Sequence, residues 1–133
     1  MEVSAFLKAV LEQDTAPVVI CDLHHTIVYM NPTAKARYHK RGGGALVGKN
    51  LLDCHGPESV AAIERVLAWF AADRRHNQVY TFHSSRENAD VYMIALRDDA
   101  GGLIGYYEKH SPRTLEAGQL YELKADAVGE MEK

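Results

Sequence analysis

The sequence contains only two cysteines, Cys21 and Cys54, among its 133 residues. Two thiols do not make the disulfide framework of a small secreted domain, and in a reducing compartment they are most simply free. The sequence also has no apolar run that approaches the roughly 20 residues of a membrane-spanning helix. Residues 1–13 lack the basic start and the apolar centre of a secretory signal. These absences predict a cytoplasmic protein that does not enter a membrane.

The sequence has no excess of positive charge, because 18 acidic residues outnumber 15 Lys and Arg residues. Nucleic-acid surfaces have the opposite balance, so we expect no nucleic-acid partner. G-x-S-x-G, P-loop, H-E-x-x-H and C-x-x-C motifs are absent, and the glycines at residues 42–44 lack the lysine of a phosphate-binding loop. The pair His24-His25 has no further ligands at zinc spacing and is interpreted as a surface pair. We predict no catalytic residues, no metal site and no enzymatic activity.

The residues that are present suit one globular domain, with 47% hydrophobic and 25% charged side chains. Apolar residues at helical spacing predict a helix over residues 4–11. Two runs rich in β-branched residues, 18–21 and 26–30, flank a short polar turn and predict a β-hairpin. Asn31-Pro32 then offers a capping side chain and a proline suited to the first helical turn, so a helix should begin there.

The second half of the chain changes its hydrophobic period. A helix is predicted over residues 58–73, followed by three strand-like runs. These runs cover residues 78–84, 91–96 and 103–108. Tyr80 and Phe82 are the larger apolar pair of the first run, so we expect them to pack under the helices. A weaker apolar stripe predicts a further helix over residues 114–131, although its two glycines are poor helix formers.

Two consecutive groups of strands with helices between them indicate an α+β fold, not βαβ alternation. This order resembles that of PAS domains, and the local segments agree with it. Residues 19–22 and 27–31 resemble the first PAS hairpin, residues 46–50 resemble the glycine-containing segment that follows the first helices, and residues 97–105 resemble the closing hairpin. The resemblance covers residues 14–111, which leaves a flanking helix at residues 1–13 and a C-terminal helix or tail at residues 112–133.

One segment is similar to a narrower subgroup of PAS domains. Residues 54–60 read CHGPESV and resemble the CHPPKSV segment of bacterial and archaeal PAS domains that often follow hemerythrin-like domains. The sequence departs from that pattern by having Gly56 in place of proline and Glu58 in place of lysine. The biochemical role of this subgroup is poorly defined, so the likeness adds no activity.

The PAS resemblance implies a five-stranded antiparallel sheet in the order 2-1-5-4-3, with helices over one face. Such domains commonly hold a small ligand between the sheet and the helices, for example haem, flavin or an organic acid. Their outer sheet face and flanking helices often pair two chains. These features are expectations for this chain, and they make its histidines, tyrosines and buried acids candidate ligand contacts.

Cys54 and His55 are the first candidates, because either side chain can be an axial ligand of haem iron. Alternatively, Cys54 is a small buried hydrophobe and His55 caps the next helix or bonds a loop carbonyl. His83 shares a predicted strand face with Val79 and Thr81. It points either into the pocket, as a polar anchor, or onto the exposed face of the sheet.

Tyr29, Tyr92 and Tyr106 are further candidates, because a buried tyrosine presents an apolar ring and a hydroxyl that needs a partner. That combination suits a ligand pocket, but it is found more often at the edge of a core or in a dimer interface. By resemblance to the subgroup, Glu108 occupies a carboxylate position in the last strand. If it points inward it needs a nearby partner, and if it points outward it is a solvated charge.

Three functions remain open from the sequence. The first is a sensory module that binds a small ligand under residues 31–73 and signals through a homodimer or a separate output protein. The second is a ligand-free interaction module in which helices at the two ends pair two chains. The third is a small enzyme, such as an isomerase on an α+β cup, and it has the least support because no acid/base constellation is present.

Overall fold

The computed structural model describes residues 3–120, and its five strands form one antiparallel sheet in the order β2-β1-β5-β4-β3. The strands are β1 (Val19–Asp22), β2 (Ile27–Met30), β3 (Gln78–Ser84), β4 (Ala89–Arg97) and β5 (Leu103–Pro112). Every neighbouring pair is antiparallel. The predicted α+β fold and strand order are therefore confirmed.

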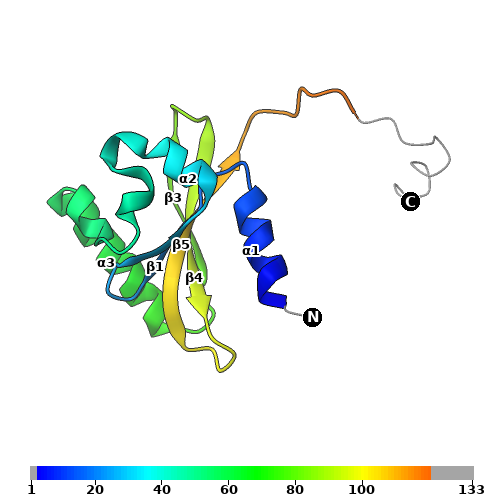
Figure 1. Cartoon of the computed structure of the whole chain (residues 1–133). Helices are drawn as coiled ribbons and strands as arrows, with labels where there is room; N and C mark the ends of the chain where they lie inside the picture. The colour runs from blue at the N-terminus through cyan, green and yellow to red at the C-terminus, as the bar shows by residue number, and fades with distance from the viewer. Residues whose placement is uncertain (1–2, 121–133) are drawn as a thin grey trace.

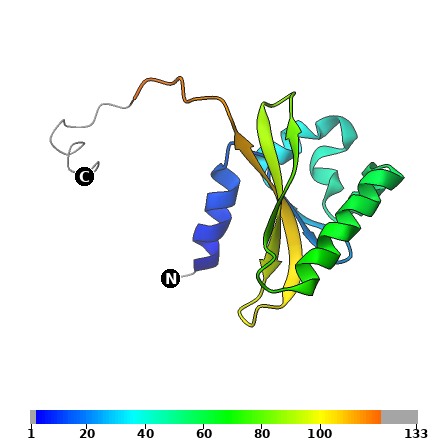
Figure 2. The same cartoon turned by 180° about the vertical axis from the view of Figure 1, so that it is seen from behind.

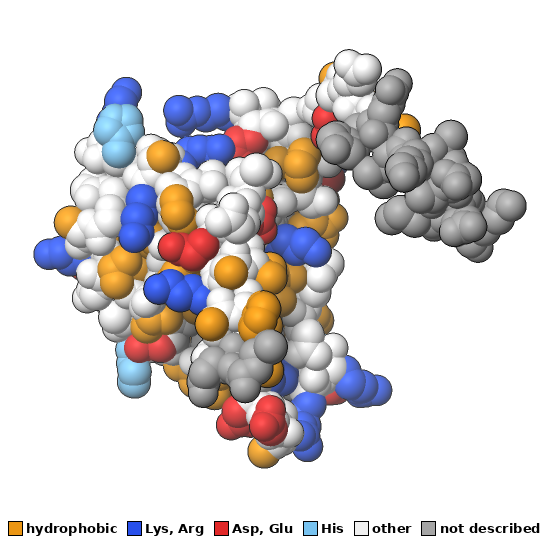
Figure 3. Space-filling model, turned by 45° about the vertical axis from the view of Figure 1, so that its right-hand side comes forward, with side chains coloured by type: hydrophobic (Ala, Val, Ile, Leu, Met, Phe, Trp, Pro, Cys, Tyr) orange, Lys and Arg blue, Asp and Glu red, His pale blue; other side chains and the backbone are white. Residues whose placement is uncertain are grey.

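The helices form layers on the two sides of this sheet (Figures 1 and 2). They are α1 (Val3–Gln13), α2 (Pro32–Arg37) and α3 (Pro57–Ala72), with the short 3-10 helices η1 (His39–Arg41), η2 (Gly43–Leu46) and η3 (Leu51–Cys54) between α2 and α3. The segments from α2 to α3 cover one face, called here the inner face. Helix α1 lies beside the opposite, outer face, and Figure 3 shows hydrophobic side chains on the side of the molecule that carries it.

Asn31 joins the two layers at the end of the first hairpin. Its side-chain oxygen accepts hydrogen bonds from the backbone N–H of Ala34 at 2.9 Å and of Val18 at 2.9 Å. Its amide group donates to the backbone oxygens of Leu11 at 3.1 Å and Ala16 at 2.9 Å. The residue is fully buried, so the predicted cap of α2 also ties the end of α1 to the sheet.

Arg97 holds the other end of the helical layer. Its Nη2 atom donates to the backbone oxygens of Phe70 at 2.7 Å, Asp73 at 3.2 Å and His76 at 3.2 Å. The last carbonyl groups of a helix have no partner within that helix. One guanidinium from β4 therefore satisfies carbonyls at and beyond the end of α3 and fixes where the helix ends.

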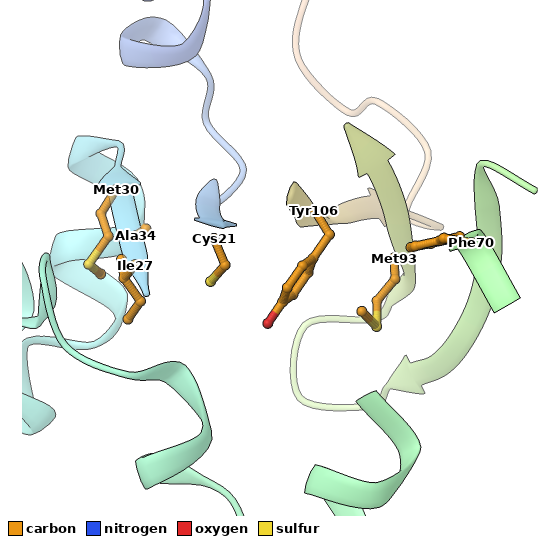
Figure 4. Packing of buried hydrophobic residues seen from close by; sticks show 7 residues of the cluster. All are labelled: Cys21, Ile27, Met30, Ala34, Phe70, Met93 and Tyr106. Atoms are coloured by element: carbon orange, nitrogen blue, oxygen red, sulfur yellow. The ribbon is translucent and has the colours of Figure 1, made fainter. Parts of the chain in front are cut away.

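The hydrophobic core lies between the inner face and the helical layer (Figure 4). Its buried members come from strands β1, β2, β4 and β5 and from helices α2 and α3. They are Cys21, Ile27, Met30, Ala34, Phe70, Met93 and Tyr106. Phe70 is the fully buried residue of α3, so this part of the helix faces the sheet.

A β-bulge in β3 changes the expected alternation of side chains. Tyr80 pairs with Tyr92, whereas Phe82 pairs with Val91, so the register shifts between them. Tyr80 consequently packs against Tyr92 on the outer face, with ring centroids 5.3 Å apart and the ring planes tilted by 38°. The expectation that Tyr80 packs under the helices is wrong, because the extra residue of a bulge reverses the phase. Phe82 does face α3 but stays half-exposed.

The chain after β5 leaves the domain (Figure 1). Residues 114–120 are not helical, so this part of the helix predicted over residues 114–131 is wrong. Leu115 and Leu120 are exposed, and without an apolar partner a weak helical stripe containing Gly118 gains little from folding. The rest of that prediction lies outside the described residues. No helix within residues 3–120 is long and apolar enough to cross a bilayer.

Candidate functional site

A cavity of about 100 Å³ lies between the inner face of the sheet and the segments that connect β2 to α3. One part of its wall is apolar, and the other carries polar and ionisable groups. The apolar part consists of Pro17, Val19, Cys21, Ile27, Met30, Leu46 and Leu51. The polar part consists of Tyr38, Arg41, Cys54, His55, Tyr106, Glu108 and His110. An apolar wall with a few convergent polar groups is typical of a small-molecule site.

A second, more open hollow of about 190 Å³ lies between α3 and strands β3 and β4. Ile63 and Val66 of α3 face Phe82 and Met93 of the sheet across this hollow. His55 and Glu108 line both the cavity and the hollow. These two side chains therefore lie between the cavity and the hollow and separate the two spaces.

Four of the candidate residues come together at the cavity. Cys54 is the last residue of η3 and His55 follows it, while Tyr106 and Glu108 are two residues apart on one face of β5. Cys54 is not a buried hydrophobe, because it is exposed, and His55 does not cap α3, because Gly56 is the N-cap. A strand places alternate residues on the same face, which is why Tyr106 and Glu108 point the same way.

The other three candidates lie on the outer face. The Tyr29 hydroxyl donates to Oε2 of Glu12 in α1 at 2.5 Å. His83 lies 3.4 Å from the carboxylate of Asp90, measured from its Nδ1 atom. Tyr92 packs against Tyr80. The structure does not bring these side chains to the cavity, and we do not include them in the candidate site.

Sequence analysis missed a chain of charged groups that leads into the cavity. Arg37 of α2 forms an ion pair with Glu87 in the β3–β4 turn, and Nδ1 of His110 lies 2.8 Å from Oε2 of Glu87. On its other side, Nε2 of His110 lies 3.8 Å from Oε2 of Glu108. The alternation of residues along β5 places residues 106, 108 and 110 on one face, and this was the only local signal for these contacts. Arg37 and Glu87 are distant from β5 in sequence, so no local pattern predicts that they meet it.

Burial shifts the ionisation of both β5 groups toward their neutral forms. It raises the pKa of Glu108, against the opposing influence of His110 and then His55. It lowers the pKa of His110, which the nearby Glu108 partly offsets. Removing a charged group from water disfavours its charged form, which raises the pKa of an acid and lowers that of a base. A charged group that enters the polar end of the cavity would therefore change the ionisation of Glu108 and His110.

A second polar contact crosses the floor of the cavity. Nδ1 of His25 lies 2.8 Å from the hydroxyl of Tyr106, and the two rings meet edge to face with centroids 5.7 Å apart. His25 adopts a left-handed backbone with φ of 66° and is half-buried, so its interpretation as a surface residue is wrong. Burial raises the pKa of the adjacent Cys21 thiol to about 11, with the Tyr106 hydrogen bond acting in the opposite direction. The floor is thus uncharged at Cys21 near neutral pH.

Haem does not fit this cavity in the conformation described. Even drug-sized ligands occupy pockets of about 300–1,000 Å³, whereas the cavity measures about 100 Å³. Cys54 and His55 have suitable donor atoms, but the space beside them does not admit a macrocycle. Within residues 3–120, no three His, Cys, Asp or Glu side chains gather as a metal site. The room and the wall chemistry suit a compact organic molecule.

Comparison with protein families finds one match. A family described as the PAS fold matches residues 11–114, which is most of the chain. A search of curated proteins finds no significant match.

Several solved structures share the arrangement of strands and helices. The C-terminal domain of a Streptococcus mutans protein has 22% sequence identity and a TM-score of 0.63, over 84% of this chain and 85% of that one. A sensory box sensor histidine kinase from Vibrio cholerae has 16% identity and a TM-score of 0.56, over 85% and 94%. The Aer2 receptor of Vibrio cholerae, described as a dual PAS-haem oxygen sensor, has 20% identity and a TM-score of 0.52, over 74% and 94%. At these identities the likeness concerns the fold.

Proposed function

This chain belongs to the PAS fold family, and from that premise we propose that it is a sensory module that binds a small molecule between its sheet and its helices. The observation that carries the proposal is the cavity, whose apolar wall faces convergent polar groups on β5 and η1. Cores are normally packed without spaces of this size. A space with both kinds of wall is therefore better explained by a ligand than by imperfect packing.

The position of the cavity suggests how binding would reach the rest of the molecule. Strand β5 contributes Tyr106, Glu108 and His110 to the wall, and it pairs with both β1 and β4. A ligand changes the population of two states only if it binds one of them more tightly. Contacts to β5 would provide that difference, because the strand lies at the centre of the sheet.

The ligand we propose is a compact organic molecule and not haem. The Vibrio receptor is described as a haem sensor, but the cavity of this chain is too small for the group. The proposed sensing domain is residues 14–111, with flanking segments at residues 1–13 and 112–133. Its assignment to the subgroup with the CHPPKSV segment, and to the cytoplasm, remains a prediction from the sequence.

We expect the signal to leave through a homodimer or a separate output protein. Four large apolar residues of α1 are 56 to 68% exposed. They are Val3, Phe6, Leu7 and Val10. Exposed apolar clusters of this kind mark interaction surfaces, and a second copy of the chain offers a matching helix. This surface is also the observation that favours the alternative function, a ligand-free interaction module.

The proposed dimer can be tested on α1 itself. Phe6→Glu places a charge in the apolar cluster and should convert the dimer to a monomer in light scattering. Lys8→Glu introduces the same side chain at an exposed polar position of the same helix and should leave the dimer intact. A monomeric wild-type protein, or equal effects of both substitutions, would remove α1 from the interface and leave output through a separate protein.

The sensory proposal is tested by native mass spectrometry of freshly purified protein. We expect a bound small-molecule mass on the wild-type chain. Leu51→Trp fills the cavity and should abolish that mass, while Val47→Trp adds the same ring at an exposed position outside the wall and should retain it. A dimer with no bound mass, unchanged by Leu51→Trp, would favour the interaction module.

A small enzyme is the third possibility, and the described residues offer nothing in its favour. Glu108 and His110 are two ionisable groups in one site, but their nearest atoms are 3.8 Å apart. No nucleophile is activated beside them, since the neighbouring Cys21 thiol has its pKa raised and not lowered. We assign the site to binding and no catalytic step to it.

A further inference from the structure

Glu108 has an unusual position among the charged groups of the domain. It lines both the cavity and the hollow under α3. About 35% of its side-chain surface is accessible. The nearest ion-pair partner among the described residues is Nε2 of His110 at 3.8 Å, which is beyond hydrogen-bonding distance. The carboxylate therefore faces the open spaces without a hydrogen bond from another side chain of residues 3–120.

Two basic groups on this side of the sheet already contact another carboxylate. Arg37 pairs with Glu87, and Nδ1 of His110 contacts the other oxygen of Glu87. An ionised carboxylate only accepts hydrogen bonds, so the hydrogen of this contact belongs to His110 Nδ1. The neutral ring then has no hydrogen on Nε2 to offer Glu108. Arg41 is exposed at the mouth of the cavity, where water solvates its charge.

The site thus has one carboxylate that no cationic side chain of residues 3–120 pairs within hydrogen-bonding distance. A carboxylate that is partly removed from water is more stable when it is paired and hydrogen-bonded. A ligand that carries N⁺–H donors would supply both, through short charge-assisted hydrogen bonds. A carboxylate ligand would instead place two negative groups together. The apolar wall and the volume of about 100 Å³ restrict the rest of the ligand to a short hydrocarbon part.

We propose that the cavity binds a compact primary ammonium ion with a short apolar chain, and that Glu108 is the residue that accepts its N–H groups. The proposal rests on the function given above, because it names the class of ligand for the same cavity. It goes beyond that function by predicting the sign of the ligand's charge and the residue that recognises it.

The pH dependence of binding follows from the groups that face Glu108. These groups are His110 and Tyr106 on the same strand, Cys21 on β1, Tyr38 and Arg41 after α2, and His55 after η3. Protonation of Glu108 removes the charge that attracts the ammonium group. Protonation of His110 adds a repelling charge, so both changes weaken binding as the pH falls. Because burial raises the pKa of Glu108, the loss begins at a higher pH than for an exposed glutamate.

The test compares three probes that differ only in their polar group. n-Butylammonium, n-butanol and n-butyrate are titrated into the full chain while ¹H–¹⁵N spectra are recorded. We expect n-butylammonium to shift signals of β5 and η3 and to bind at least tenfold more tightly than n-butanol. We expect no such shifts with n-butyrate. Equal or tighter binding of n-butyrate would overturn the inference.

Glu108→Gln removes the charge and keeps the shape of the side chain. It should reduce n-butylammonium affinity at least tenfold and leave n-butanol affinity unchanged. Glu64→Gln makes the same change at an exposed position of α3 and should have no effect on either probe. If Glu108→Gln does not fold, the wild-type pH series replaces it. There, n-butylammonium binding should weaken toward acidic pH and n-butanol binding should not, and a pH-independent n-butylammonium affinity would overturn the inference.

The outcomes separate this inference from the proposed function. If the protein carries a bound mass that Leu51→Trp abolishes, yet Glu108→Gln does not affect the probes, the sensor stands and the ligand class is wrong. If none of the three probes binds, the inference is wrong as well. If in addition no bound mass is found, the sensory function fails with it.

Discussion

Side chains of the same kind differ in burial and in contacts between the two faces of the sheet. On the inner face Tyr106 is buried, contacts His25 and helps to enclose the cavity. On the outer face Tyr80 is half-exposed, packs against Tyr92 and hydrogen-bonds Asp90 at 2.8 Å. The inner face is therefore organised around an enclosed space and the outer face around a surface. A sensor needs both, one to receive a ligand and one to contact a partner.

The contrast between the faces can be measured on neighbouring residues of β4. Met93 is buried on the inner face and Tyr92 is half-buried on the outer face. Met93→Ala should lower the free energy of unfolding by about 2–5 kcal/mol, because it leaves a cavity in a packed core. Tyr92→Ala should cost about 0.5–1.5 kcal/mol, the value of an aromatic pair. Urea unfolding monitored by circular dichroism would show this difference, and equal losses would contradict it.

Asn31 links the two faces, and its removal should cause the next largest loss in the free energy of unfolding. Asn31→Ala loses a helix cap, worth about 1 kcal/mol. It also leaves buried backbone groups without partners, which costs roughly 1–3 kcal/mol more. Asn50→Ala is the matched control, because Asn50 accepts a hydrogen bond from Leu52 N–H at 2.8 Å in an exposed 3-10 helix. Thermal unfolding should rank Asn31→Ala well below Asn50→Ala, and the reverse order would refute the linking role.

Acid should also destabilise the fold through Asp90 on the outer face. We expect this loss of stability to be smaller than those of Met93→Ala and Asn31→Ala. Hydrogen bonds from Arg113 and then Tyr80 lower the pKa of Asp90 to about 2. A carboxylate whose pKa is lower in the folded state stabilises the fold above its unfolded pKa of about 3.9. That contribution is lost as the pH falls from about 4 to about 2. It should disappear in Asp90→Asn in acid unfolding curves, and an unchanged curve for this variant would contradict the role of Asp90.

The sequence predicted the elements well where a regular period fixed them. The run predicted over residues 78–84 is β3, and the predicted helix over residues 58–73 is α3 within one residue at each end. The strand order came from the family resemblance, because periodicity does not say which strands are neighbours. The face of Tyr80 was predicted wrongly, since a one-residue bulge changes no composition but reverses the alternation.

The candidate site was predicted only in part, for a related reason. Tyr106 was chosen for its residue type and Glu108 by resemblance to the subgroup, and both line the cavity because they lie on one face of β5. The Arg37–Glu87–His110 contacts join residues far apart in the chain, and no local pattern predicts such pairs. Tyr29 was chosen for its residue type, but its hydroxyl binds Glu12 of α1 on the other face. Residue type alone does not say on which side of a sheet a side chain lies.

The most direct test of a ligand-receiving inner face is a crystal structure of the protein purified under mild conditions and without added ligand. Our account predicts electron density for a small organic molecule in the cavity, in contact with Leu51 and with the carboxylate of Glu108. A cavity closed by its own side chains, or one that holds only ordered water, would contradict it.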